Sequence, residues 1–137
     1  MKSLKGYVSS RVFMGERCPQ HIQNVVLRDY CKKVDSQYVL SGVEYAMNNS
    51  FLMLQQLIYE IPKIDGIVAY SLFQFPEIQD DRLIIYQKIL KRKGEIHFAV
   101  EGLKITTNSE IDRVEDIWLV RQALPYCYNP ETNILVK

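Results

Sequence analysis

An almost uninterrupted apolar run, Ile67-Val68-Ala69-Tyr70, follows Asp65-Gly66 near the middle of the chain. A strand that is apolar on both faces is typical of the centre of a parallel sheet that helices cover on both sides. Three further strands are predicted at Gly6–Ser10, Gln37–Ser41 and Glu95–Val100, with a helical pattern after each strand. This alternation predicts an α/β three-layer sandwich with a four-stranded, mostly parallel sheet of order 2-1-3-4.

The helices are marked by residues that favour their ends and by apolar residues three or four positions apart. Pro19, Ser50, Pro76 and either Asn108 or Ser109 are expected at their starts. The last helix is expected to end before Pro125. The residues predicted to face the core are Ile22, Val26, Tyr30, Phe51, Leu54, Ile58, Ile61, Ile78, Ile85, Ile89, Ile111, Val114, Ile117, Trp118 and Leu124.

Length and composition indicate one globular domain. The chain has 137 residues, of which 47% are hydrophobic and 24% charged, as in an average globular protein. We expect a single domain over residues 1–125 and a C-terminal tail over residues 126–137. The net charge of +1 is low for a dedicated nucleic-acid binder.

The same chain carries no pattern typical of export, membrane insertion or metal binding. The N-terminus lacks an apolar signal segment, and no apolar run is long enough to span a bilayer. The three cysteines form no CxxC pair and have no zinc-type spacing with a histidine. We therefore expect a cytoplasmic protein with free thiols and no metal.

Polar residues follow the predicted strands at their carboxyl ends. In a sheet of order 2-1-3-4 the order reverses between the first and third strands, which is where such sheets bind ligands. The free N–H groups at the start of the first helix favour an anion in the same crevice. Alternatively, the serines merely end a strand and Arg11 is solvated. The expected ligand-binding residues are Ser9, Ser10, Arg11, Gln23, Asn24, Arg28, Tyr70, Ser71 and Gln74.

Carboxylates and phenols also follow these strands, and partly buried groups of this kind can transfer protons. The candidate catalytic residues are Tyr7, Glu44, Tyr45 and Glu101, with a plain surface loop as the alternative for Glu44-Tyr45. The six glycines form neither a GxGxxG pattern nor a Walker A loop. We therefore predict no cofactor, and we expect His97 to be an interior residue of the fourth strand.

From roughly Gly6 to Ile105 the sequence distantly resembles the catalytic domain of serine recombinases, or resolvases. The likeness rests on a Gly-Tyr strand with serines, on the helix around Leu27, and on the strand after Ile64. The resemblance implies a resolvase-like or flavodoxin-like fold.

The chain departs from that family at the residues that carry the chemistry. The recombinase motif Tyr-x-Arg-x-Ser would place Arg at position 9 and Ser at position 11, where this chain has Ser9 and Arg11. The family's Asp-Arg-Leu-x-Arg loop is replaced by Ser71-Leu72-Phe73-Gln74-Phe75. Since those arginines would neutralise the scissile phosphate, we do not expect strand exchange.

A second resemblance is to the small "sporadic carbohydrate cluster protein" family, found among genes for bacterial surface carbohydrates. It implies a role in making or modifying an unusual sugar. The segments that carry it are Gly6–Arg11, Gln23–Cys31, Leu40-Ser41 with Glu44-Tyr45, Gly66–Phe73, His97–Ala99 and Arg113–Arg121.

On these grounds we expect a small protein of surface-carbohydrate biosynthesis that binds or acts on a sugar phosphate or nucleotide sugar. A cofactor-independent lyase, isomerase or hydrolase fits the missing motifs. The alternative is a non-catalytic accessory protein that binds a partner enzyme of the same pathway. DNA binding comes third, because of the balanced charge and the lost arginines, so neither a nucleic-acid nor a membrane partner is expected.

The last helix predicts self-association. Its apolar stripe leaves Leu119 and Val120 pointing away from the core. Exposed apolar residues beside a tryptophan are typical of an interaction surface, and two-fold symmetry is the commonest way to cover one. We expect a homodimer through the helix Glu110–Leu124.

Overall fold

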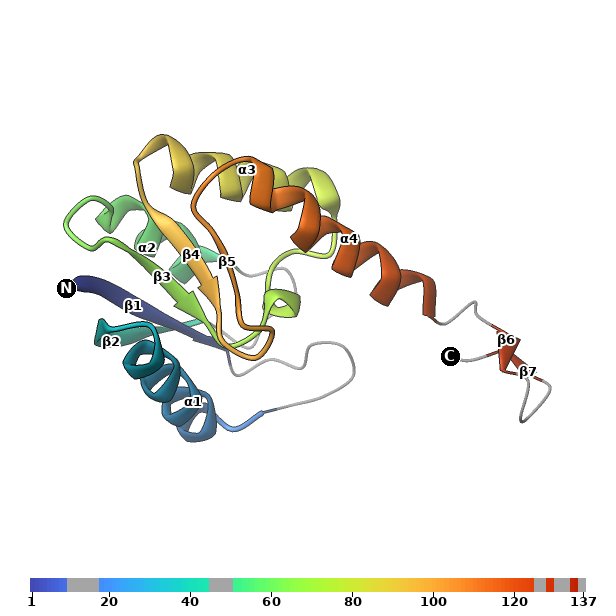
Figure 1. The fold of residues 1–137 in the computed structure, drawn as a ribbon, viewed down its shortest axis with the longest axis horizontal. Coiled ribbons are helices and arrows are strands. Elements are labelled where there is room, and N and C mark those ends of the chain that lie inside the picture. Colours follow the sequence, from blue (N-terminus) through green and yellow to red (C-terminus); the bar gives the residue numbers. More distant parts are fainter. Residues whose placement is uncertain (10–17, 45–50, 125–127, 130–133, 136–137) are drawn as a thin grey trace.

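The computed structural model of this chain describes residues 1–9, 18–44, 51–124, 128–129 and 134–135 (Figure 1). Its centre is a five-stranded sheet of order β2-β1-β3-β4-β5. The first four strands pair in parallel, which confirms the predicted order. Their bounds are Lys2–Ser9 for β1, Ser36–Glu44 for β2, Gly66–Ala69 for β3 and Glu95–Phe98 for β4.

The fifth strand corrects the prediction of a four-stranded sheet. β5, Leu103–Ile105, pairs with β4 in the antiparallel direction. The chain turns back through Gly102, whose φ of 65° suits glycine and whose N–H donates to the Phe98 carbonyl over 2.9 Å. The predicted fourth strand, Glu95–Val100, is therefore too long, because its last residues belong to this turn.

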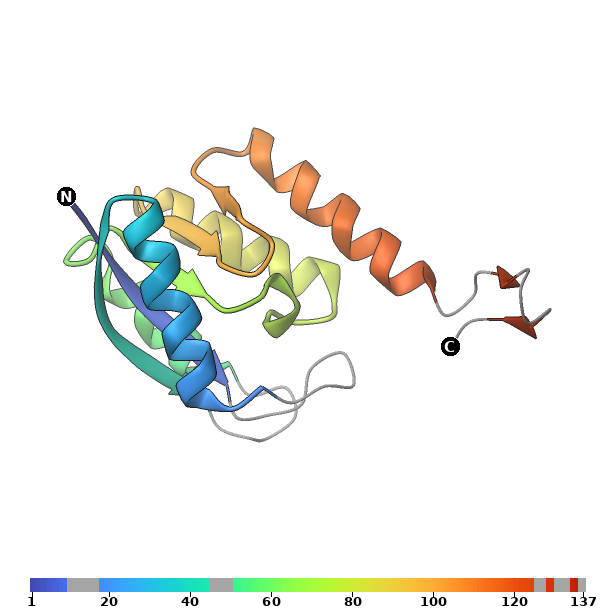
Figure 2. The same cartoon turned by 60° about the horizontal axis from the view of Figure 1, so that its bottom comes forward.

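Helices lie on both faces of the sheet, as Figures 1 and 2 show. α1 packs over one face in a small cluster with Leu4, Val8 and Val68. The other three helices and the short 3-10 helix η1 pack against the opposite face in a larger cluster that includes Trp118. Their bounds are Gln20–Lys33 for α1, Leu52–Glu60 for α2, Leu72–Gln74 for η1, Gln79–Lys91 for α3 and Ser109–Ala123 for α4.

The buried face of α1 differs from the prediction by one residue. The structure buries Gln23, Leu27 and Cys31, whereas Ile22 is 42% exposed. The polar Gln23 can be buried because its amide is fully used in hydrogen bonds, described below. The expected stripe of Ile22, Val26 and Tyr30 is therefore wrong in register.

Two other helix starts also differ. α3 begins at Gln79 instead of Pro76, which leaves Ile78 outside the helix and 65% exposed. Ser50, the expected start of the second helix, lies outside the described residues. In the tail, β6 (Tyr128–Asn129) and β7 (Ile134–Leu135) pair only with each other within the described part. Among the described residues, no helix is long and apolar enough to cross a bilayer.

Candidate functional site

The buried side-chain amide of Gln23 links the elements that meet at the predicted crevice. Gln23 Oε1 accepts hydrogen bonds from the Ser9 N–H at 3.2 Å and from Gln74 Nε2 at 2.9 Å. Gln23 Nε2 donates to the carbonyls of Ser9 at 2.8 Å and Cys18 at 2.7 Å. All three predicted site residues, Ser9, Gln23 and Gln74, are at most 1% exposed. The predicted meeting of β1, α1 and the loop after β3 is therefore present, but the amide groups bind one another.

The loop after β3 is closed by a carboxylate. Glu101 accepts hydrogen bonds from Ser71 Oγ at 2.8 Å and from the Leu72 N–H at 3.0 Å. Ser71 caps η1 by accepting from the Phe73 N–H, while its own N–H donates to Gln74. Glu101 thus stabilises a short helix, at the position where a phosphate-binding loop would need positive charge.

Tyr7 and Glu44 form a second buried pair. The Tyr7 hydroxyl donates to Glu44 Oε2 over 3.0 Å, and both side chains are at most 1% exposed. The same carboxylate accepts from the N–H groups of Met53 and Leu54 in the first turn of α2. A carboxylate at a helix N-terminus stabilises the helix, so Glu44 joins β1, β2 and α2.

The remaining predicted residues lie elsewhere. Asn24 Oδ1 accepts from the Tyr38 hydroxyl over 2.6 Å, and Arg28 lies 5.8 Å from the centroid of the Tyr38 ring, so both face β2. Tyr70 packs against the cluster beneath α1. Ser10, Arg11 and Tyr45 lie outside the described residues. The described part of the predicted crevice therefore offers structural hydrogen bonds and two carboxylates, an arrangement suited to holding the fold and poorly suited to binding an anion.

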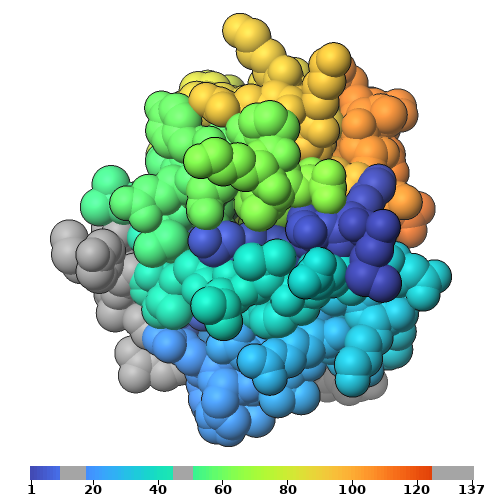
Figure 3. Space-filling model, turned by 90° about the vertical axis from the view of Figure 1, so that its left-hand side faces the viewer, coloured from blue at the N-terminus to red at the C-terminus, as the bar shows by residue number. Residues whose placement is uncertain are grey.

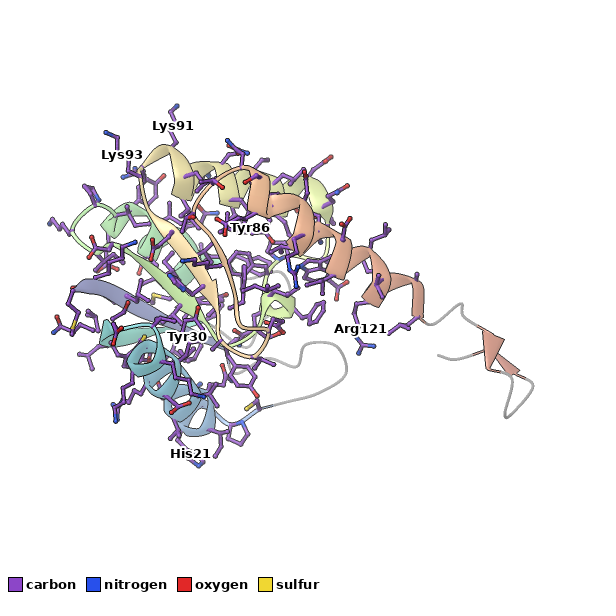
Figure 4. The ribbon with its side chains drawn as sticks, viewed as in Figure 1. His21, Tyr30, Tyr86, Lys91, Lys93 and Arg121 are labelled. Carbon is purple, nitrogen blue, oxygen red and sulfur yellow. The ribbon has the colours of Figure 1, made fainter. Side chains whose placement is uncertain are left out.

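A basic surface that the sequence did not predict lies at the amino ends of β3 and β4, opposite the carboxyl-end site. It comprises exposed cations at the end of α3 and one after α2, and we call it the basic patch: Lys63, Lys88, Lys91, Arg92 and Lys93. In Figure 4, Lys91 and Lys93 project outward from the same end of the molecule. Four basic residues within Lys88–Lys93 were the signal that could have found it.

Contacts within the protein hold the basic patch together. The Arg92 guanidinium lies 5.0 Å from the centroid of the Tyr59 ring and donates to the Ile61 carbonyl over 3.1 Å. These contacts bring the end of α3 beside the end of α2, as the yellow and green segments show in Figure 3. Of the neighbouring acids, Glu60 pairs with Lys5, and Asp65 keeps its charge while it accepts the Ser3 N–H. The five cations of the basic patch outnumber these two carboxylates.

Known proteins resemble this chain in structure only. No protein-family model and no curated protein sequence matches it. A resolvase-family site-specific recombinase from Streptococcus pneumoniae superposes with a TM-score of 0.61 at 12% identity, covering 87% of this chain and 88% of its own. The N-terminal catalytic domain of TP901-1 integrase superposes with a TM-score of 0.60 at 16% identity, covering 86% and 94%.

This similarity shows a resolvase-like α/β fold across most of the chain. The expected role in surface-carbohydrate biosynthesis is contradicted, because the structural neighbours are a site-specific recombinase and the catalytic domain of an integrase. That expectation drew on short sequence segments such as Arg113–Arg121, which lies in α4. Membership of the carbohydrate-cluster family stays an untested prediction.

Proposed function

We propose that this chain takes part in DNA recombination as a duplex-binding domain of resolvase-like fold, without cutting the strands itself. The observation that carries this proposal is the basic patch, which concentrates on one surface the positive charge that a net +1 conceals. Lysine and arginine contacts to phosphates supply most of the affinity of sequence-independent DNA binding. The fold of the structural neighbours supports DNA as the partner, in place of the expected absence of a nucleic acid.

The carboxyl-end site supports binding over strand cleavage. Ser9, at the end of β1, is 1% exposed, and both its backbone groups bind Gln23. Glu101 adds a negative charge close to Ser71, where the recombinase loop would supply arginines. A scissile phosphate needs accessible hydroxyl and positive charge at the same place, and the described residues supply neither there.

The test is the affinity for a short random-sequence duplex, measured by fluorescence anisotropy at several salt concentrations. We expect the double variant Lys91→Gln/Lys93→Asn to bind about tenfold more weakly at low salt, because two phosphate contacts are lost. The dependence of log affinity on log salt should become shallower by about 2. Asparagine is chosen at position 93 because Lys93 has a φ of 63°, which asparagine tolerates.

The matched control is Lys32→Gln/Lys33→Gln, which removes the same charge from the end of α1. It should keep the wild-type salt dependence. Equal losses in both double variants, or no measurable duplex binding by the wild type, would reject the proposal. Nicking of supercoiled plasmid by the wild type but not by Ser9→Ala would show that the chain cleaves strands itself.

We also propose that two copies associate through α4. Leu119 and Val120 are 67% and 61% exposed. Beside them, a groove of about 430 Å³ is lined by Phe73, Ile117, Val120 and Leu124, with Arg113, Asp116 and Arg121 around it. An apolar strip with a charged rim has the composition of a protein interface.

A further inference from the structure

Two polar side chains of β4 lie on the face of the sheet that α1 covers. Strand residues alternate between faces, so Ile96 and Phe98 enter the large core, whereas Glu95 and His97 point to the opposite side. A cavity of about 520 Å³ opens beside them, near the start of β1. It is separate from the basic patch and from the carboxyl-end site.

The polar groups form a chain of short hydrogen bonds. Lys2 Nζ donates to Glu95 Oε2 over 2.8 Å, and His97 Nε2 lies 2.7 Å from Glu95 Oε1. His97 Nδ1 lies 2.7 Å from the hydroxyl of Tyr30, in the last turns of α1. Four residues from β1, β4 and α1 are thus coupled at one side of the cavity.

The protonation states of Glu95 and His97 determine which group donates and which accepts in each of these hydrogen bonds. Burial alone would raise the pKa of Glu95, but the hydrogen bonds from Lys2 and His97 outweigh it and hold that pKa below its ordinary value. Burial lowers the pKa of His97 despite the neighbouring carboxylate, so the ring is neutral at pH 7. An ionised Glu95 accepts a hydrogen bond from the Nε2–H group, which leaves Nδ1 as an acceptor for the Tyr30 hydroxyl.

Tyr30 therefore presents an acceptor to the cavity. Burial raises the pKa of Tyr30 to about 12, so the hydroxyl keeps its proton and donates a hydrogen bond to His97 Nδ1. The lone pairs of the phenolic oxygen then accept hydrogen bonds from whatever occupies the cavity. Asp35, directly after α1, adds a carboxylate to the same side of the lining.

The part of the cavity lining that β5 contributes carries positive charge. Lys104 lies on β5 directly across from His97 in the antiparallel register and lines the cavity. Its charge also contributes to lowering the pKa of His97, which places it close to the ring. The cavity thus has acceptors along α1 and an ammonium along β5.

We propose that this cavity binds a small carboxylate that also carries a hydroxyl group. The carboxylate pairs with Lys104, and the hydroxyl donates to the phenolic oxygen of Tyr30. The volume lies within the range of small-molecule sites. His97 acts as a positioning residue, because Nδ1 accepts the hydrogen bond of the Tyr30 hydroxyl and thereby fixes which hydrogen bond the ligand makes.

The test compares two probes that differ only in that hydroxyl, L-lactate and propionate. Each is titrated into the full chain while the imidazole signals of His97 are followed by NMR. We expect lactate to bind about fivefold more tightly than propionate, because one additional hydrogen bond changes affinity by about that factor. In Tyr30→Phe the His97 signals should still shift when lactate is added, but the dissociation constant of lactate should rise to that of propionate.

Charge is tested separately. Lys104→Gln should weaken both probes about threefold without changing their ratio, since a solvent-exposed ion pair contributes modestly. Lys91→Gln, which removes a charge outside the cavity lining, should change neither constant. Equal affinity of the wild type for the two probes, or no shift of the His97 signals with either, would overturn the proposal.

Discussion

At Gly66 the backbones of β3 and β4 approach so closely that no side chain fits between them. A methyl group added there would overlap the carbonyl oxygen of Glu95 and contact its side chain. The strand can move little, because Gly66 pairs with Leu4 of β1 on one side and with Glu95 of β4 on the other. The residue is therefore fixed by space and not by backbone conformation.

We predict that Gly66→Ala lowers the free energy of unfolding by about 1–3 kcal/mol, because the overlap must be relieved by shifting backbone. Urea denaturation followed by circular dichroism measures the change. The control is Gly102→Asn, at a glycine with positive φ and open space around it. It should stay within about 0.5 kcal/mol of the wild type. Unchanged stability of Gly66→Ala would mean that the two strands separate more easily than this packing implies.

Among the helices, α3 and α4 are joined by one buried cation. Arg82, 2% exposed, donates from Nε and Nη2 to the two oxygens of Glu115 over 2.9 and 2.7 Å. Its guanidinium carbon lies 4.1 Å from the centroid of the Trp118 ring, and Nη1 donates to the carbonyls of Pro76 and Glu77. This planar, fully paired arrangement uses nearly every donor that arginine has.

Arg82→Lys should lower the free energy of unfolding by about 2–4 kcal/mol, although it keeps the charge. A lysine cannot form the paired contact with Glu115 or stack on Trp118, so part of the buried network loses its partners. Chemical denaturation checks the value, and Arg113→Lys on the exposed side of α4 is the matched control. Should both variants be equally stable, the attachment of α4 to α3 would rest on apolar packing alone.

The elements show which sequence signals determine structure. Apolar runs such as Ile67–Ala69 predicted the parallel strands correctly, because burial on both faces leaves no other pattern. β5 was missed because three residues, one of them the exposed Lys104, carry too little periodicity. The face of α1 was misplaced by one position because its burial depends on Gln23, whose partners Ser9 and Gln74 become neighbours only in the fold.

For the whole molecule, the proposed dimer predicts a particle of twice the 16.1 kDa chain in sedimentation at micromolar concentration. Leu119→Glu together with Val120→Glu should convert it to monomer, because both side chains lie on the exposed face of α4 and charges there would be buried by a partner. Leu40→Glu places the same charge on β2, at a residue that is 79% exposed, and should leave the dimer intact. A wild-type monomer would exclude association through α4.

At this scale the sequence predicted where polar residues meet but not what they do. The convergence of Ser9, Gln23, Ser71, Gln74 and Glu101 follows from strand order, which the sequence carries. Their mutual hydrogen bonds depend on distances that no pattern encodes. The cavity beside Tyr30 was missed because Lys2, Tyr30, His97 and Lys104 are far apart in sequence and are joined only by the sheet.

The position of β2 at the border of the sheet has a practical consequence for handling the protein. Within the described residues, no strand covers its outer side, and its sequence SQYVLSGVE holds neither proline nor a positive charge. Leu40 and Val43 are 79% and 40% exposed there. Edges of this kind template intermolecular strand pairing, which most proteins suppress with lysine, proline or a bulge. Of these features, β2 has only a register irregularity between Val39 and Gly42, opposite Lys5–Tyr7 of β1. Concentrated samples should thus aggregate through strand pairing along β2. A single charged residue in place of Leu40 should reduce this aggregation.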